Sequence, residues 1–113
     1  MLLNDIIREL ELEVFCGSSR LEVDIRRGFA SDLMSDVIAN AEAGDIWVTL
    51  QVHLNTVAIA SMKDLGAILL TQDRKPLPET TAKAEKEEIP ILGSPLSAFE
   101  LIGRLYHLGI SGC

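Results

Sequence analysis

Short apolar runs separated by polar loops dominate the second half of the chain. Residues 46–50, 67–70 and 89–92 are almost continuously apolar, which is typical of strands that a sheet buries on both faces. A polar loop follows each run, and each loop leads into a stretch with helical features. These strand–loop–helix units predict right-handed crossovers and a largely parallel sheet.

Helix signals occupy the intervals between these strands. One helix is expected over about residues 55–65 and a second over 79–88, where Ala, Lys and Glu predominate and most side chains should face solvent. Ser97 or Ser94 is expected to cap a closing amphipathic helix.

The first forty residues predict the remaining elements. Asn4 is expected to cap a first helix, and residues 12–16 to form a strand. Residues 21–26 alternate apolar and polar side chains, the pattern of a strand near a sheet edge with one wet face. Ser31 is expected to cap a helix over residues 32–41.

The chain has the length and the apolar content of one domain. It has 113 residues and a mass of 12.3 kDa, and 48% of its residues are hydrophobic, enough to bury a core. We therefore expect a single α/β domain over residues 1–113. Its architecture should be three-layer α/β/α, with a largely parallel sheet of about five strands.

The net charge and the two cysteines limit the kinds of partner that this protein is expected to bind. A net charge of -7 opposes binding to a phosphate backbone, so we expect no nucleic-acid partner. No apolar run approaches the roughly 20 residues of a membrane span, and charged residues follow Met1 too closely for a signal peptide. We expect a cytoplasmic protein without a membrane partner. Cys16 and Cys113 lack metal-site spacing, so no metal or cofactor is expected.

Catalytic motifs are absent from the sequence. It contains no Walker-type GxxxxGK[ST] loop, no GxGxxG after a strand, no HExxH and no GxSxG. Phosphoryl transfer would therefore lack its usual phosphate cradle and lysine. An enzyme built on His53 would also need a carboxylate or nucleophile partner that the sequence does not supply. We expect a protein that is not an enzyme.

Polar side chains follow two neighbouring predicted strands. If these strands are parallel, their carboxyl ends bring together Thr49, Gln51, His53, Asn55 and Thr71 beside a helix N-terminus. Helix amides there suit an anion, while Gln and Asn side chains suit a base or ribose. The alternative is structural: Asn caps the helix, the threonines satisfy loop backbone, and the histidine is solvated.

The two Ser-Asp steps near residue 31 offer a further group of polar side chains. Ser31, Asp32 and Ser35 form a second wall of the crevice or a contact across a dimer. Alternatively, Ser31 is only a helix cap and Asp32 only complements the helix dipole. Trp47 is expected to pack in the core or in a dimer interface rather than stack on a ligand.

Several segments of the chain resemble the DRTGG domain family. The matching segments are Gly44-Asp45-Ile46-Trp47-Val48-Thr49, Ile68-Leu69-Leu70-Thr71 with Lys75-Pro76 after it, and Ile89-Pro90-Ile91-Leu92. The resemblance covers essentially the whole chain. Domains of this family are regulatory modules in some phosphotransacetylases and CBS-containing pyrophosphatases, and they are similar to the N-terminal domain of HPr kinase/phosphatase. The resemblance implies a regulatory module that pairs as a homodimer.

The chain departs from the motif that gives the family its name. The Asp-Arg pair falls on Val52 and His53, and the Thr-Gly-Gly triplet falls on Thr71, Gln72 and Asp73. Only Thr71 keeps the family residue. Because glycine permits close approach of the backbone to a phosphate, the loss of both glycines implies a different loop chemistry.

Two functions remain open from the sequence. The first is a non-catalytic regulatory module that senses an adenine nucleotide or another phosphorylated metabolite at the carboxyl edge of the strands. Such a module would act through a homodimer or a partner protein. The alternative is a ligand-free assembly or scaffold protein that acts by protein–protein contact.

Overall fold

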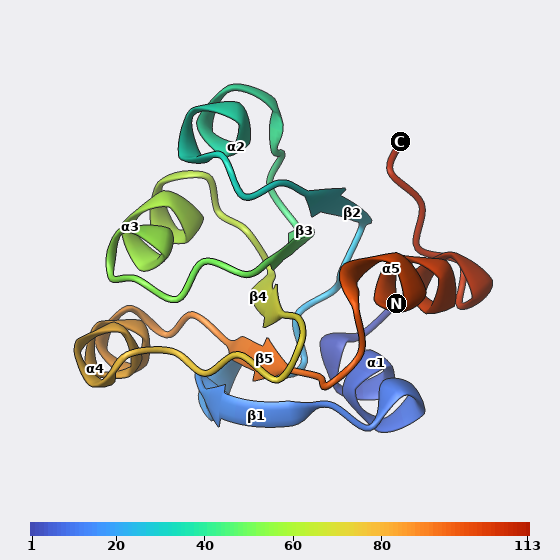
Figure 1. Ribbon diagram of the computed structural model, residues 1–113, viewed down its shortest axis with the longest axis horizontal. Coiled ribbons are helices and arrows are strands. Elements are labelled where there is room, and N and C mark those ends of the chain that lie inside the picture. Colours follow the sequence, from blue (N-terminus) through green and yellow to red (C-terminus); the bar gives the residue numbers. More distant parts are fainter.

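The computed structural model describes residues 1–113, which form a five-stranded sheet with helices on both faces (Figure 1). The strand order is β1-β5-β4-β3-β2. The parallel strands are β2 (Arg27–Ala30), β3 (Asp45–Thr49), β4 (Ala67–Leu70) and β5 (Ile91–Gly93). β1 (Glu13–Cys16) is antiparallel to β5. The predicted three-layer α/β/α fold with a largely parallel sheet is confirmed.

The helices are distributed unequally between the two faces of the sheet. α2 (Met34–Asn40), α3 (Asn55–Met62) and α4 (Pro78–Glu87) connect β2 to β5 in steps that all move the same way across the sheet. Since such crossovers share one hand, they place all three helices on one face. α1 (Leu3–Leu10) and α5 (Ala98–His107) cover the other face, at the right of Figure 1. Both faces of the sheet are therefore buried.

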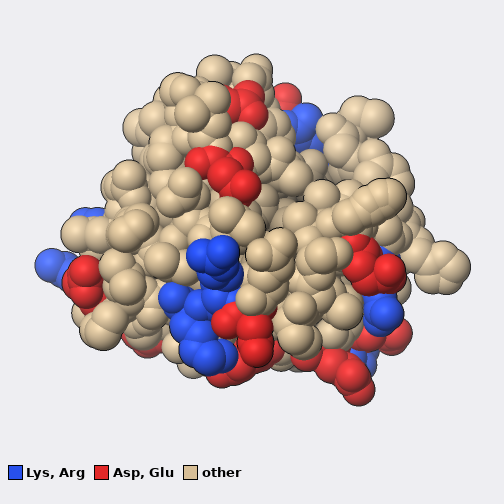
Figure 2. Space-filling view, viewed as in Figure 1, with Lys and Arg blue, Asp and Glu red and all other residues tan.

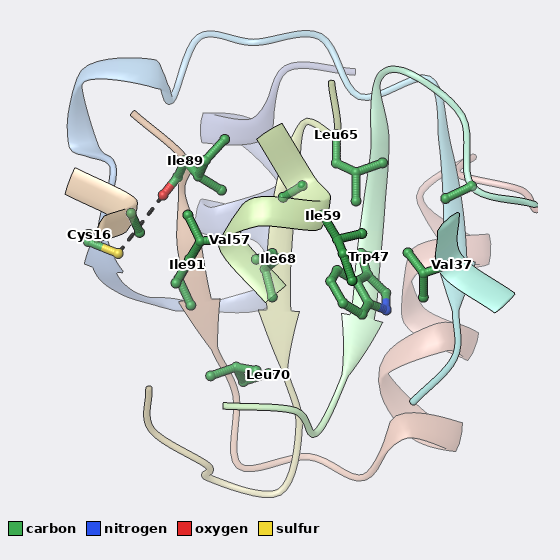
Figure 3. Close-up of a cluster of buried hydrophobic side chains, with 13 residues drawn as sticks. Cys16, Val37, Trp47, Val57, Ile59, Leu65, Ile68, Leu70, Ile89 and Ile91 are labelled. Carbon is green, nitrogen blue, oxygen red and sulfur yellow. Dashed lines mark hydrogen bonds between the residues drawn. The ribbon is translucent and has the colours of Figure 1, made fainter. Parts of the chain in front are cut away.

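Two apolar clusters lie between the sheet and these helix layers. Trp47 and Ile68 pack with Val57 of α3 on one face (Figure 3), whereas Ile46 and Leu69 pack beneath α1 and α5 on the other. This alternation is the period of two that a strand imposes. The Trp47 ring is fully buried, and its Nε1 donates to the carbonyl of Ser31 at 2.8 Å. Trp47 is thus a core residue, one of the two predicted roles.

The strand predicted over residues 21–26 is wrong. The sheet edge is formed by β2, while residues 21–26 run beside α1, where the amide of Leu3 donates to the carbonyl of Val23 at 2.9 Å. Side-chain burial still alternates, with Ile25 buried and Glu22 and Asp24 exposed. The alternating pattern indicates only that one face of the segment is buried. Here α1 buries part of that face, and no neighbouring strand pairs with the segment.

Helix starts follow the sequence only in part. Asn4 lies inside α1, which begins after Leu2 without a side-chain cap. Ser31 precedes α2 by a short turn, in which its Oγ accepts from the amide of Leu33 at 3.1 Å. Ser97 does cap α5, because its Oγ accepts from the amide of Glu100 at 3.3 Å.

Candidate functional site

A pocket of about 180 Å³ lies where β2, β3 and β4 end. Because these strands are parallel, their carboxyl ends share one edge, the usual place for ligands in such sheets. The lining residues come from the ends of the strands, the loops that follow them and the first residue of α5: Ala30, Ser31, Asp32, Val48, Thr49, Leu50, Thr71 and Ala98. Four of the residues predicted from sequence therefore line one pocket.

Asp32 organises the polar wall of this pocket. Its Oδ1 accepts from the hydroxyl of Thr49 at 2.7 Å and from the amide of Leu50 at 2.9 Å. Gln51 completes the network, since its Nε2 donates to the backbone carbonyl of Asp32 at 3.0 Å. The Asp32 carboxylate is thus fixed in place by protein groups, and its Oδ2 accepts no hydrogen bond from the chain.

Thr71 carries the one buried side-chain polar atom that lacks a hydrogen-bond partner. Its side chain is 0% exposed, and it follows directly after β4. Three other buried threonines, Thr49, Thr56 and Thr80, all donate to an oxygen. An unmet buried hydroxyl costs about 1–3 kcal/mol, and Thr71 is also one of the residues that line the pocket.

The first four backbone amides of the loop after β4 already donate hydrogen bonds within the protein. The amides of Thr71, Gln72, Asp73 and Arg74 donate to the carbonyls of Thr49, Leu96, Ser94 and Thr71, respectively, at 2.9–3.2 Å. These four amides are therefore not available to a phosphate. The interpretation from sequence, that loss of the two glycines changes the loop chemistry, agrees with this arrangement.

His53 and Asn55 lie elsewhere. Both are exposed and line a separate, open hollow between α3 and α4, together with Leu54, Ala58, Glu79 and Lys83. Asn55 does not cap α3, because the cap position is Leu54 and no side chain accepts a hydrogen bond there. Ser35 is exposed on α2 and lines neither the hollow nor the pocket.

The loop after β3 explains this separation. The carbonyl of Val52 accepts from the amide of Leu77 at 3.3 Å and from the hydroxyl of Thr80 at 2.9 Å. These bonds hold the loop against the start of α4, so His53 and Asn55 lie at the α3–α4 hollow.

Ala98 of α5 is a pocket residue that sequence reasoning missed, as are Ala30 and Leu50. Small or apolar side chains carry no chemical signal of their own. The sequence predicts Asp32 as a possible wall of the crevice but gives no sign of its hydrogen bond to Thr49. The missing signal was the true position of β2: a strand ending at Ala30 places Asp32 at the carboxyl edge.

Asp32 is the only charged residue that lines the pocket. Figure 2 shows a face that is mostly uncharged, with one group of basic side chains near its centre and acidic atoms beside it. Lys75, which follows β4, is exposed and lies 3.5 Å from Glu13 and 5.2 Å from the centre of the Phe15 ring. The pocket itself is therefore acidic.

One other titratable side chain, that of Cys16, lies in the core. Burial raises the pKa of the Cys16 thiol to about 11, so this residue stays a protonated core group near neutral pH. No three His, Cys, Asp or Glu side chains lie together in a way that would hold a metal ion. No helix has the length and apolar character that crossing a membrane requires.

Comparison with known proteins adds a likeness of fold. No family profile matches the chain, and no curated protein matches it. Among solved structures, the fold matches the CBS and DRTGG domains of the regulatory region of Clostridium perfringens pyrophosphatase, complexed with the activator diadenosine tetraphosphate. The TM-score is 0.75, with 17% sequence identity over 97% of this chain and 47% of that one.

The chain has a DRTGG-like fold. At 17% identity the likeness concerns the fold alone, and it agrees with the resemblance found in the sequence. The chain spans about half the length of the pyrophosphatase structure, and the activator is described for that whole region.

Proposed function

We propose that this chain is a non-catalytic regulatory module that binds a nucleotide or a related phosphorylated metabolite in the pocket of Ser31, Asp32, Thr49 and Thr71. The effect of ligand binding would be transmitted through a homodimer or to a partner protein. The observation that carries the proposal is the buried Thr71 hydroxyl, which lacks a partner in a pocket at the carboxyl edge of a parallel sheet.

Two further observations support this proposal. The Asp32 network holds the polar wall in place before any ligand arrives, and such preorganisation lowers the entropic cost of binding. The fold is also similar to that of part of a region described in complex with a nucleotide activator. The absence of catalytic motifs from the sequence favours sensing over catalysis.

Calorimetric titration tests the proposal directly. The panel contains adenosine, AMP, ADP, ATP, diadenosine tetraphosphate, the guanine counterparts and acetyl phosphate. We expect saturable binding of at least one compound, and a loss of about 5- to 10-fold in affinity in Thr71→Val, the amount that one neutral hydrogen bond is worth. The same substitution should stabilise the free protein by about 1 kcal/mol, because it removes an unsatisfied hydroxyl.

Thr81→Val is the matched control. Thr81 lies on α4 outside the pocket, and its hydroxyl makes only a long bond of 3.4 Å to the carbonyl of Leu77. This variant should bind as the wild type does. His53→Ala and Asn55→Ala extend the titration to the α3–α4 hollow. The proposed site would be contradicted if the wild type binds none of the compounds, or if Thr71→Val binds them with unchanged affinity.

A second candidate is the assembly protein. Two aromatic side chains of α5 face solvent: Phe99 is 79% exposed and Tyr106 is 57% exposed. Exposed aromatic side chains on one helix favour protein contact. Sedimentation equilibrium of the wild type and Phe99→Glu separates the two ideas: assembly lost in the variant, with no ligand bound by either protein, would favour this candidate.

A further inference from the structure

The pocket at the ends of β2, β3 and β4 is too small for a whole nucleotide. Its volume is about 180 Å³, whereas pockets that enclose drug-sized ligands span about 300–1,000 Å³. Only one part of a nucleotide can therefore enter it, and the lining residues decide which part.

Charge and backbone chemistry both exclude the phosphate. The Asp32 carboxylate lines the pocket with a full negative charge and no basic partner there. The positive end of α5, at Ala98, supplies only about half a charge, which does not balance the full charge of Asp32. The amides of residues 71–74 in the loop after β4, which would otherwise be available to an anion, are all engaged. A phosphate would meet net repulsion in this pocket.

Hydroxyl groups fit the same lining. The Oδ2 of Asp32 is a carboxylate oxygen with no hydrogen bond from the protein, and it can accept from a ligand hydroxyl. The Thr71 hydroxyl can donate to a second ligand oxygen or accept from it. A carboxylate after a neighbouring parallel strand is also the group that binds ribose hydroxyls in dinucleotide-binding folds.

We infer that this pocket binds the ribose of a ribonucleoside through its 2′,3′-diol, with the phosphates directed outward. This inference rests on the proposed function and states which end of the ligand is recognised. Asp32 accepts from the diol, Thr71 completes the hydrogen bonding, and Thr49 and Gln51 hold Asp32 in place.

A ligand series on the wild-type protein tests the inference without any substitution. Affinities of adenosine, 2′-deoxyadenosine, 3′-deoxyadenosine, AMP, ATP and free ribose are measured by calorimetry, with inorganic phosphate as a competitor. We expect each deoxy compound to bind about 10- to 100-fold more weakly than adenosine, as expected for a lost hydrogen bond to a charged group. Phosphate should not compete with adenosine.

Asp32→Asn provides a signature that a general loss of structure would not produce. The amide keeps the shape of the side chain but removes the charge. Adenosine should therefore bind more weakly than to the wild type, and the affinity of ATP should come closer to that of adenosine. Asp36→Asn is the matched control. Asp36 lies on α2 outside the pocket, where it accepts from Asn40 at 2.7 Å, and its substitution should leave the ratio of the two affinities unchanged.

The outcomes separate the two proposals. If nucleotides bind in a way that depends on Thr71 but the deoxy compounds bind as well as adenosine, ribose recognition is overturned and the proposed function stands. Competition by inorganic phosphate would overturn ribose recognition in the same way. If no nucleoside or nucleotide binds at all, the proposed function is overturned and this inference with it. Binding of free ribose in addition to adenosine would show that the diol is recognised apart from the base, which supports the assignment.

Discussion

Gln72 and Asp73 have a left-handed backbone without being glycine. Their φ angles are 56° and 60°, and these are the positions on which the DRTGG resemblance places the two glycines. Side chains in this conformation cost roughly 1–2 kcal/mol each. The bend persists because both amides donate to the β5–α5 loop, at the carbonyls of Leu96 and Ser94. The chain thus forms a glycine-type turn without glycines.

Restoring glycine should relieve this strain. We expect Gln72→Gly and Asp73→Gly each to raise the free energy of unfolding by about 0.5–1 kcal/mol, measured by urea denaturation. Glu88→Gly, at φ 58° after α4, should give a similar gain. Ala82→Gly inside α4 should instead cost about 1 kcal/mol. Destabilisation by glycine at positions 72 and 73 would mean that these side chains make contributions larger than the strain.

The central strands could be predicted closely from the sequence, and the reason is burial. The predicted run 67–70 coincides with β4, and 46–50 differs from β3 by one residue at each end. Strands covered on both faces must be apolar at every position, so their composition marks them. Residues 21–26 carried a weaker signal, because alternation shows that one face is dry without showing which element covers it.

In the candidate site, the sequence predicts the positions of residues at strand ends but not the paths of the loops that follow them. Thr49 and Thr71 come immediately at strand ends, so the parallel sheet alone brings them together. His53 lies farther along its loop, and the path of that loop depends on bonds from Leu77 and Thr80 to the carbonyl of Val52. Such long-range contacts leave no local pattern in the sequence.

The pairing of β2 with β3 depends on a buried ion pair at the opposite edge from the pocket. Arg27 donates to both carboxylate oxygens of Asp45, at 2.8 and 3.1 Å, and Asp45 is 0% exposed. This hydrogen bonding and the nearby charge raise the pKa of the Arg27 guanidinium above its usual value. Arg27 and Asp45 are the first pair of residues aligned between β2 and β3. The same alignment of the two strands places Asp32 beside Thr49.

Removing one partner of this ion pair should be costly. We expect Arg27→Met to lower the free energy of unfolding by about 3 kcal/mol, because it leaves a buried carboxylate uncompensated. Adding Asp45→Asn should restore at least about 1 kcal/mol of that loss. The exposed pair of Arg104 and Glu100 on α5 is the comparison, and Arg104→Met should cost less than about 0.5 kcal/mol. Equal losses at the two arginines would show that burial of Asp45 does not control the effect.

Net charge and pocket charge have the same sign in this protein. The chain carries -7, and Asp32 adds a local negative charge to the pocket lining. A nucleotide approaches with several negative charges on its phosphates, whereas a nucleoside approaches with none. Salt screens such repulsion between exposed charges over a Debye length of about 10 Å at 0.1 M. Ionic strength can therefore distinguish recognition of the ribose from recognition of the phosphate.

We expect ATP to bind more tightly as salt is raised, by roughly threefold or more between about 20 mM and 300 mM, while the affinity of adenosine changes less than about twofold. The reason is that repulsion acts only on the phosphates, and the diol contacts are short-range. Calorimetric titration of both ligands over this range is the measurement. A fall in ATP affinity with salt would mean that exposed Arg74 and Lys75 bind the phosphates directly. In that case Arg74→Gln with Lys75→Gln should abolish the salt dependence, whereas wild-type behaviour in this double variant would mean that other basic side chains bind the phosphates.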